Sequence, residues 1–517
     1  MGRPDPREEH SGRVNAAHII RLSVCQKRLK NMSAVQHPSG AFAELMAIRA
    51  GRPLATGEVT ITGQDPLYRS PFRIGETLAM ALAARGVAAN DLWELRGGAR
   101  QRIEVDVRAA AATSQSGRAV TLIRDADGQY RPIPVSAALQ HMVSMTQPWQ
   151  AADGRWVLPH TNLPHLERRV LDVLQCENTV ESIKAAIGRR PSDALDAAIA
   201  AVNACAAKVL TPEEWLAHPQ GAYLAARPVV EITRVGDSAP EALPFGDQPL
   251  SGVRVLDLTR ILAGPTASLG LAEHGADVLM VTAPDLPQVP SFVRDTSHGK
   301  RSCFLDFNRA DQATTFRKLA QGADILVDGY RPGRLAARGF GVDELTALRP
   351  GLIYVTVNCF GSGGPLAARA GWDQIAQAIT GMCHIQGEAI GAGQPKLAPV
   401  PICDFLTGFL GTFGALVALA RRTREGGSYH VQVSLCQAAM LFQRQGLLAH
   451  FDAAPGQLTP EEFEALAVRV DGTCYGDLKT LGPVLHMSQT PCRWSRPTPR
   501  LGGDRPEWLA RPAPLRL

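Results

Sequence analysis

The carboxylate with the most informative surroundings in this sequence is Asp404. It follows a short apolar run, Val400–Cys403, and it precedes a long apolar stretch with three arginines between positions 421 and 424. Gly426 and Gly427 then stop the pattern, so we predict one helix of about five turns that starts at Asp404. At that position an aspartate can cap the helix by accepting N–H groups of the first turn. It can equally be a nucleophile at the positive end of the helix, and the local sequence leaves both interpretations open.

A second acidic candidate, Asp373, ends the segment Gly-Trp-Asp. Its carboxyl could act as an acid or orient a loop, or it could cap a helix predicted over Gln374–Thr380. The neighbouring Trp372 has no basic nitrogen and cannot accept a proton. His384 lies a turn or two onward, and it could supply a base here only if the chain folded back.

The composition excludes several classes of function. Lys+Arg total 54 and Asp+Glu 49, and this mildly basic balance suits an anionic ligand but is far too small to indicate nucleic-acid binding. Ten cysteines occur without a CxxC pair or histidines at zinc-binding spacing, so we expect reduced thiols in the cytoplasm and no metal site. The apolar stretch after Asp404 fits a buried helix, so we expect no membrane association. Residues 1–39 contain no apolar signal segment and look like a disordered leader, within which Met32 is an alternative start.

Residues 249–450 are predicted to form a large α/β domain. Strand patterns alternate here with helix patterns, which indicates right-handed β-α-β units and a parallel sheet. Neither GxGxxG nor GxxxxGK[ST] occurs, so ordinary dinucleotide and P-loop sites are unsupported. The predicted strands are 252–258, 276–281, 302–307, 325–327 and 352–357, and the predicted helices between them are 265–274 and 310–320.

Residues 40–125 look like a partial duplicate of this domain. Gln101–Ala111 aligns without a gap with Tyr429–Ala439, and each segment follows a helix pattern and a pair of glycines. We find no equivalent of the segment PVPICD (399–404) in the first copy, so we expect no chemistry there. The remaining residues divide into 126–245, which reads as a smaller domain, and 451–517, which reads as a C-terminal tail.

Five segments of the large domain resemble family III CoA transferases, the CaiB/BaiF family, in that family's order. They are LSGVRVLDLTRILAGPTASLGLAEHGADVLMV (250–281), GKRSCFLDF (299–307), ILVDGYRPGRLAARGFG (325–341), LIYVTVNCFGSGGPLAARAGWDQIAQAITG (352–381) and PVPICDFLTG (399–408). The resemblance implies an α/β fold with a Rossmann-like parallel sheet, preceded here by a smaller α+β domain. This order departs from the family, in which the small domain follows the large one.

The resemblance also implies roles for individual residues. Asp404 is expected to be the catalytic nucleophile, and an aspartate with an ordinary pKa of about 3.9 is ionised at neutral pH. Trp372 and Asp373 are expected to support it. Trp372 stands where racemases of the family carry a histidine. The expected CoA-contacting residues are Leu262, Ala263, Lys300, Gly329, Tyr330, Arg331 and Arg338, with Arg260 as a weaker candidate.

The activity that the resemblance implies is transfer of CoA from an acyl-CoA to a carboxylic acid through a covalent aspartyl intermediate. CoA is then a substrate and no cofactor is tightly bound, while the partners are the acyl-CoA and the acid, with no nucleic acid and no membrane. The family resemblance also implies a homodimer. One alternative is a non-catalytic CoA-ester-binding protein, which the changed domain order and the lack of the family's glycine-rich loop favour. The other is an α-methylacyl-CoA racemase, against which Trp372 argues.

Overall fold

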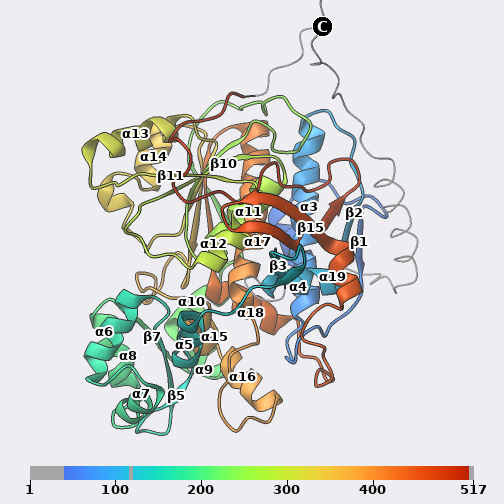
Figure 1. Ribbon diagram of the computed structural model, residues 1–517. Helices are drawn as coiled ribbons and strands as arrows, with labels where there is room; N and C mark the ends of the chain where they lie inside the picture. Colours follow the sequence, from blue (N-terminus) through green and yellow to red (C-terminus); the bar gives the residue numbers. More distant parts are fainter. Residues whose placement is uncertain (1–39, 116–119, 512–517) are drawn as a thin grey trace, which may run out of the picture.

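The computed structural model describes residues 40–115 and 120–511. A seven-stranded sheet forms the centre of the large domain, in the order β11-β10-β9-β12-β13-β14-β8 (Figure 1). The first six strands of this order are parallel, whereas β8 at the edge runs antiparallel to β14. The strands are β8 (Glu231–Gly236), β9 (Arg254–Leu258), β10 (Asp277–Thr282), β11 (Arg301–Phe304), β12 (Ile325–Asp328), β13 (Ile353–Asn358) and β14 (Ser428–Ser434).

The predicted mixed α/β fold with a parallel sheet is confirmed. All five strands predicted between 252 and 357 are present, with bounds that differ by a few residues. β10 and β11 lie on one side of β9, whereas β12, β13 and β14 lie on the other side. In a parallel sheet, such a reversal of strand order leaves a crevice at the carboxyl ends of the strands. The helices of this domain are α11 (Ala263–Glu273), α12 (Pro290–Thr296), α13 (Ala310–Gln321), η3 (Ala336–Arg338), α14 (Val342–Leu348), α15 (Asp373–Ile379), α16 (Met382–Ala389), α17 (Ile402–Glu425) and α18 (Leu435–Arg444).

Helix α17 is the long apolar helix that the sequence predicts. Among the described residues it is the one helix long and apolar enough to cross a membrane, but its most apolar window is entirely buried inside the protein. Its glycines permit close packing: a Cβ at Gly408 would lie 2.5 Å from Cβ of Thr266 and 2.8 Å from the carbonyl oxygen of Ala263. The start of α17 is therefore held directly against the start of α11.

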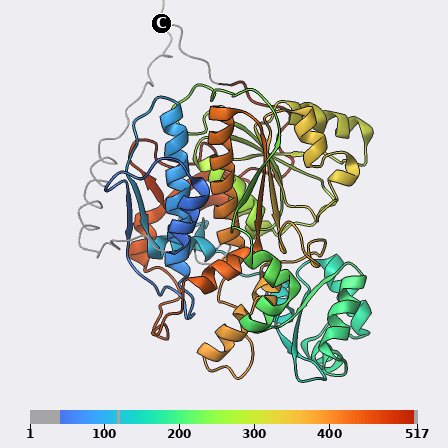
Figure 2. The ribbon, with the colours of Figure 1, turned by 180° about the vertical axis from the view of Figure 1, so that it is seen from behind.

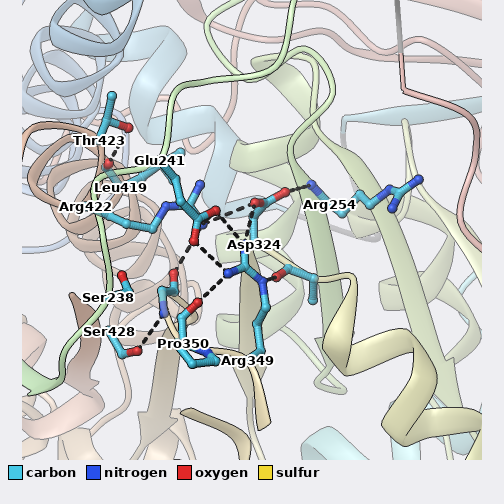
Figure 3. A network of polar contacts seen from close by, with 12 residues as sticks. Ser238, Glu241, Arg254, Asp324, Arg349, Pro350, Leu419, Arg422, Thr423 and Ser428 are labelled. Atoms are coloured by element: carbon cyan, nitrogen blue, oxygen red, sulfur yellow. Dashed lines mark hydrogen bonds and ion pairs between the residues drawn. The ribbon is translucent and has the colours of Figure 1, made fainter. Parts of the chain in front are cut away.

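Ion pairs fix the other end of α17 at the amino ends of the strands (Figure 3). Arg422 is 1% exposed, and its guanidinium donates to Asp324 at 3.1 Å and to the carbonyl oxygen of Gly351 at 3.2 Å. Arg349 binds Glu241 through two hydrogen bonds of 2.6 Å and lies 3.6 Å from Asp324. Each buried charge here faces an opposite charge, which is the condition for keeping ions in a protein interior.

A smaller α+β unit lies beside one end of the main sheet, in teal and green in Figure 1. Its antiparallel sheet has the order β5-β6-β7, and its own apolar core includes Val170, Ile183 and Leu195. The elements are α5 (Ala137–Met145), β5 (Trp149–Gln150), β6 (Trp156–His160), α6 (Pro164–Leu174), α7 (Val180–Ile187), α8 (Ser192–Ala201), β7 (Cys205–Lys208), α9 (Pro212–Ala217) and α10 (Pro219–Ala225).

Strands from both ends of the described chain form the remaining sheets. One has the order β1-β2-β17 and the other the order β15-β16-β3-β4, so strands of the predicted tail complete sheets of the N-terminal region. The elements are α2 (Ala41–Arg49), β1 (Val59–Thr62), α3 (Ile74–Leu95), β2 (Ile103–Asp106), α4 (Val107–Ala112), η2 (Thr113–Gln115), β3 (Thr121–Arg124), β4 (Tyr130–Pro132), α19 (Pro460–Leu466), β15 (Ala467–Thr473), β16 (Gly476–Leu481) and β17 (Leu485–Met487). The predicted leader, 1–39, lies outside the described residues.

The internal repeat extends further than the aligned segments. β1 pairs in parallel with β2, which pairs antiparallel with β17; in the same way β13 pairs in parallel with β14, which pairs antiparallel with β8. A long helix precedes the second strand of each unit and a short helix follows it, as α3-β2-α4 and as α17-β14-α18. The two long helices, blue and orange in Figure 2, pack side by side.

The expectation that the first copy lacks an equivalent of the PVPICD segment is wrong. The residues before the two helices, Arg73 and Pro401, have nearly identical backbone angles, with φ −75° and ψ 69° in one and φ −76° and ψ 69° in the other. Around them a proline, an isoleucine and an acidic residue stand at the same spacing, as Pro71, Ile74 and Glu76 and as Pro399, Ile402 and Asp404.

Each copy also places a buried aspartate from a Gly-x-Asp turn beside its helix. Asp65 accepts the N–H groups of Gly75 and Glu76, both at 2.9 Å, and Asp373 accepts the N–H group of Asp404 at 3.1 Å. The aspartate precedes the acidic helix residue by 11 positions in the first copy and by 31 in the second. An ungapped alignment misses the match because α15 and α16 occupy this longer interval.

Candidate functional site

Asp404 is the third residue of α17, so it is not the helix cap that one interpretation of the sequence suggested. The N-cap position belongs to Pro401, which has no side-chain acceptor. Asp404 is only 7% exposed, and no other described residue donates a hydrogen bond to its carboxylate or forms an ion pair with it. A buried carboxylate without a partner is costly to keep, and such groups occur most often where they have a chemical role.

Two cavities meet at this carboxylate. One has a volume of about 420 Å³ and the other of about 770 Å³. Both are lined by Ile261, Leu262, Trp372 and Asp404, so a ligand in either one can reach the same carboxylate.

The smaller one, here called the basic cavity, lies at the carboxyl ends of the central strands. Its walls come from the turns after β9 and β12, the end of β13, the segment before α15, and the smaller α+β unit. Its cationic side chains are Arg169, Arg260, Arg331, Arg334 and Arg369.

The charges in the basic cavity are only partly neutralised. Arg369 is paired with Asp196 through two bonds of 2.8 and 2.9 Å, whereas Arg260 donates only to the carbonyl oxygen of Pro287, at 3.1 Å. Burial, and then three neighbouring arginines, lower the pKa of His165. Such a surplus of positive charge suits a phosphorylated ligand.

The larger one, here called the apolar cavity, extends from Asp404 in another direction. Loops of the N-terminal unit and the segment 454–457 contribute to its edge. Most of its walls are aliphatic or aromatic side chains, among them Leu139, Met142, Val143, Ile261, Leu262, Val289, Phe292, Leu397 and Val400.

Asp373 is joined to Asp404 by a hydrogen bond. It is the first residue of α15, and its carboxylate accepts the N–H group of Asp404 at 3.1 Å and the side-chain amide of Gln377 at 2.5 Å. Gln377 in turn accepts the N–H group of Ala398 at 2.8 Å, which links α15 to the chain that leads into α17. The interpretation of Asp373 as the cap of its own helix is therefore replaced: it binds the first turn of α17.

Burial dominates the electrostatics of this pair. It raises the pKa of Asp373 to about 6, although the hydrogen bonds from the start of α17 and from Gln377 act in the opposite direction. Burial, with repulsion from Asp373 as the second cause, raises the pKa of Asp404 well above its ordinary value. The expectation of an ordinary pKa for Asp404 is therefore wrong, because the sequence does not reveal how completely the helix start is enclosed.

Comparison with known proteins shows which family the region around this site resembles. Residues 250–468 match the model of CoA-transferase family III. This region of the chain is therefore similar to CoA-transferase family III. An acetyl-coenzyme A transferase of Hypoxylon pulicicidum is 40% identical over 200 residues, which cover 38% of this chain and 34% of that protein. A succinate–glutarate CoA-transferase of Agrobacterium fabrum is 33% identical over 264 residues, covering 44% and 66%.

The likeness is confined to part of each protein. The chain spans between a third and two thirds of these two relatives. A crystal structure of a CaiB/BaiF family protein from Brucella suis is 30% identical, with a TM-score of 0.35, over 38% of this chain and 56% of that one.

Most of the CoA-contacting residues implied by the family resemblance line the basic cavity together with Asp404. These are Leu262, Ala263, Gly329, Tyr330 and Arg331, together with the weaker candidate Arg260. Their proximity follows from the parallel sheet, which brings the turns after β9 and β12 to the same edge.

Lys300 departs from the family-based expectation. Its side chain has no exposed surface, and its ammonium group donates to Asp257 at 3.0 Å, to Ser268 at 2.8 Å and to the carbonyl oxygen of Pro265 at 2.8 Å. In this structure Lys300 cannot contact CoA directly. Its ion pair with Asp257 instead connects β9 and the start of α11, which forms one wall of the basic cavity.

Arg338 is exposed and lies outside the lining of both cavities. Its guanidinium donates to the side chain of Asn308 at 3.2 Å and to the carbonyl oxygen of Arg334 at 3.4 Å. The structure thus does not place it at the site, and its contact with CoA stays a prediction.

The arrangement offers no second base in the position that a family racemase requires. Trp372 lines both cavities, and its ring stacks on that of His160 at a centroid distance of 4.3 Å. His160 is completely buried behind it, and burial lowers its pKa to about 3. His384 lies on α16, 3.2 Å from Glu388, and lines neither cavity.

Sequence reasoning missed several residues of the basic cavity. His165, Arg169 and Asn203 come from the smaller α+β unit, and Arg334 and Arg369 come from loops of the large domain. The carbonyl oxygen of Asn203 accepts hydrogen bonds from both Arg169 and Arg331, at 3.0 Å each, and so joins the two units. Arg334 and Arg369 lie inside the family-like segments 325–341 and 352–381, so these two residues had a signal in the sequence, whereas the residues of the smaller unit had none.

Two further findings bear on the expectations from composition. Within the described residues no group of three or more His, Cys, Asp or Glu side chains could hold a metal ion. All nine cysteines of the described ranges are free thiols.

Proposed function

We propose that this protein transfers CoA between an acyl-CoA and a carboxylic acid, with Asp404 as the covalent nucleophile. The observation that carries the proposal is the position of Asp404 at the junction of a basic and an apolar cavity. CoA in the basic cavity and an acyl group in the apolar one would place the thioester bond beside this carboxylate.

The proposed reaction uses four exchanges at acyl carbons. The Asp404 carboxylate attacks the thioester carbonyl, and the CoA thiolate leaves as an acyl–aspartyl anhydride forms. The thiolate then attacks the aspartyl carbonyl, which gives an enzyme–CoA thioester and releases the first carboxylate. The second carboxylate attacks this thioester to form a new anhydride and thiolate. Attack of that thiolate on the new acyl carbon gives the product acyl-CoA and restores Asp404.

The attacking form of Asp404 is the carboxylate, so its raised pKa has a direct consequence. The fraction of active enzyme should increase with pH as Asp404 loses its proton. Once ionised and poorly solvated, the carboxylate is a stronger nucleophile than one in water. Asp373 acts as a positioning residue because its hydrogen bond fixes the backbone of Asp404.

The arginines of the basic cavity are proposed to bind the CoA phosphates. Arg260 is largely buried and makes one hydrogen bond to protein, so Arg260→Ala should weaken CoA-ester binding by about 1.5–3 kcal/mol. Arg338→Ala is the informative comparison, since the family resemblance predicts a similar loss and its exposed position predicts a smaller one. Isothermal titration with each variant decides which of the two arginines contacts CoA.

Trapping of the intermediate tests the proposal most directly. Hydroxylamine should convert Asp404 to a hydroxamate, and borohydride should reduce the thioester, in both cases only after incubation with an acyl-CoA. Mass spectrometry of the peptide that contains Asp404 detects either product. Acyl exchange without a modification at Asp404 would contradict the proposed nucleophile.

The alternative is a protein that binds CoA esters without turnover. The raised pKa of Asp404 favours this reading, because the protonated acid is a poor nucleophile. Tight binding of acyl-CoA with no trapped product between pH 6 and 9 would establish it.

A further inference from the structure

We propose that the apolar cavity is an acyl subsite for unbranched or bulky apolar groups of medium length, and that it disfavours short dicarboxylic acyl groups. The inference rests on the proposed function, because it assigns the second cavity at the same carboxylate. Its volume of about 770 Å³ falls within the range of cavities that enclose whole small molecules.

The chemistry of the walls is the first argument. The cavity that Asp404 borders is also lined by Ile261, Leu262, Val400, Phe292 and Met142. An apolar chain lying along these side chains gains free energy with each methylene removed from water. A charged group in the same place would lose its hydration without gaining a partner.

The polar groups of the lining are the second argument, because most are already bonded to protein. The hydroxyl of Tyr68 donates to the carbonyl oxygen of Ala111 at 2.9 Å, and the amide of Gln115 donates to that of Gly456 at 2.6 Å. Gln377 is used by Asp373 and Ala398, as described above. These groups are therefore occupied, and a second carboxylate of a substrate would have to use the remaining donors of the lining, among them those of Ser291, Lys396 and Gln457.

The two cations of the lining are the groups that a dicarboxylate would need. Arg69 is mostly exposed and lies 3.3 Å from Asp452, so its charge is balanced at the surface. Lys396 is half-buried and has no side-chain partner among the described residues. It is the one group that could reverse the preference, and it is therefore included in the test.

The wall formed by α5 contains a position at which a substitution can change the lining of the apolar cavity without unfolding the protein. Val143 on α5 lines it and is nevertheless 49% exposed, so a polar substitution there should not unfold the protein. Val135, just before the same helix, is 47% exposed and lies outside the lining. Val143→Asp and Val135→Asp therefore form a matched pair, which separates an effect on the cavity from an effect on surface charge.

The experiment measures affinity rather than turnover, with Asp404→Asn as a non-reacting form of the full chain. Titration with CoA, acetyl-CoA, butanoyl-CoA, hexanoyl-CoA and octanoyl-CoA should show a two- to fourfold gain per added methylene. Glutaryl-CoA should bind no more tightly than butanoyl-CoA. Val143→Asp should reduce the advantage of octanoyl-CoA over CoA about tenfold, and Val135→Asp should leave it unchanged.

Three results would overturn the assignment. Equal affinity for CoA and all its esters would show that the acyl group does not enter the cavity, while the CoA site of the proposed function would stand. Tighter binding of glutaryl-CoA than hexanoyl-CoA, abolished by Lys396→Met, would replace an apolar subsite with a dicarboxylate subsite. Failure of CoA itself to bind would remove the proposed function and this inference together.

Discussion

The starts of α3 and α17 have the same backbone geometry but differ in their chemistry. Each helix carries an acidic third residue, Glu76 or Asp404, beside a buried aspartate. Burial raises the pKa of both Asp65 and Asp373 to about 6. In α3, however, Arg73 donates to Glu76 at 2.9 Å, and the side chain of Glu76 keeps 20% exposure.

The comparison shows where the surroundings of the two acidic residues differ. Proline replaces arginine at the position before α17, and no cation among the described residues is paired with Asp404. Asp404 also borders two cavities, whereas Glu76 lines neither of them. The backbone geometry is therefore shared, and the missing counter-ion and the enclosed space are the differences on which the proposed chemistry at Asp404 rests.

The largest effect should come from removing the charge at the reactive start. Asp404→Asn should lower CoA exchange at least about a thousandfold, since an amide cannot form the anhydride. Glu76→Gln is the matched change in the first copy, and it should leave the rate within twofold. The measurement is transfer of labelled CoA between esters, and full exchange activity of the Asn variant would end the transferase proposal.

A smaller effect should follow from giving α17 the arginine of α3. Pro401→Arg fits the backbone, because Arg73 already adopts the same angles. An ion pair with Asp404 would stabilise the ground-state carboxylate by about 1.5–3 kcal/mol, so at a pH where Asp404 is ionised in both proteins exchange should slow by about 10- to 100-fold. Pro401→Ala controls for loss of the proline, and equal rates in the two variants would show that the counter-ion is irrelevant.

The pH profile should change when the neighbouring aspartate is neutralised. The charge of Asp373 is the second cause of the raised pKa of Asp404, so Asp373→Asn should move the acid limb of kcat/KM to lower pH. Asn retains an acceptor for the N–H group of Asp404. Asp65→Asn in the first copy should leave the limb in place, and a shift in both variants would point to an effect on folding.

The smallest effect concerns stability. The folded-state pKa of Asp404 is raised, so its contribution to stability is present below the unfolded pKa of about 3.9 and is lost as pH rises toward the folded value. Asp404→Asn should therefore increase the free energy of unfolding at pH 7, and increase it by less at pH 4. Thermal unfolding at the two pH values measures this, and Glu76→Gln should give no gain because it loses the ion pair with Arg73.

The sequence by itself determined the elements and the central residue. Alternating strand and helix patterns predicted the parallel sheet, and the apolar stretch between Asp404 and the glycine pair predicted α17, which begins two residues earlier than expected, at Ile402. The family resemblance located the turns of the basic cavity, because those contacts lie within short, continuous segments. The sequence revealed only the part of the repeat that aligns without a gap. The buried aspartates of the two copies were missed, because different lengths of chain separate them from the acidic helix residues.

Only the tertiary structure decided the electrostatics and the extent of the site. The burial of Lys300 and the raised pKa of Asp404 depend on which segments pack over them, and no local pattern encodes that enclosure. The same holds for Arg169 and Asn203, which reach the basic cavity because the smaller α+β unit folds against the large domain. Periodicity reports which face of an element is apolar, whereas the meeting of distant side chains is fixed by packing between elements.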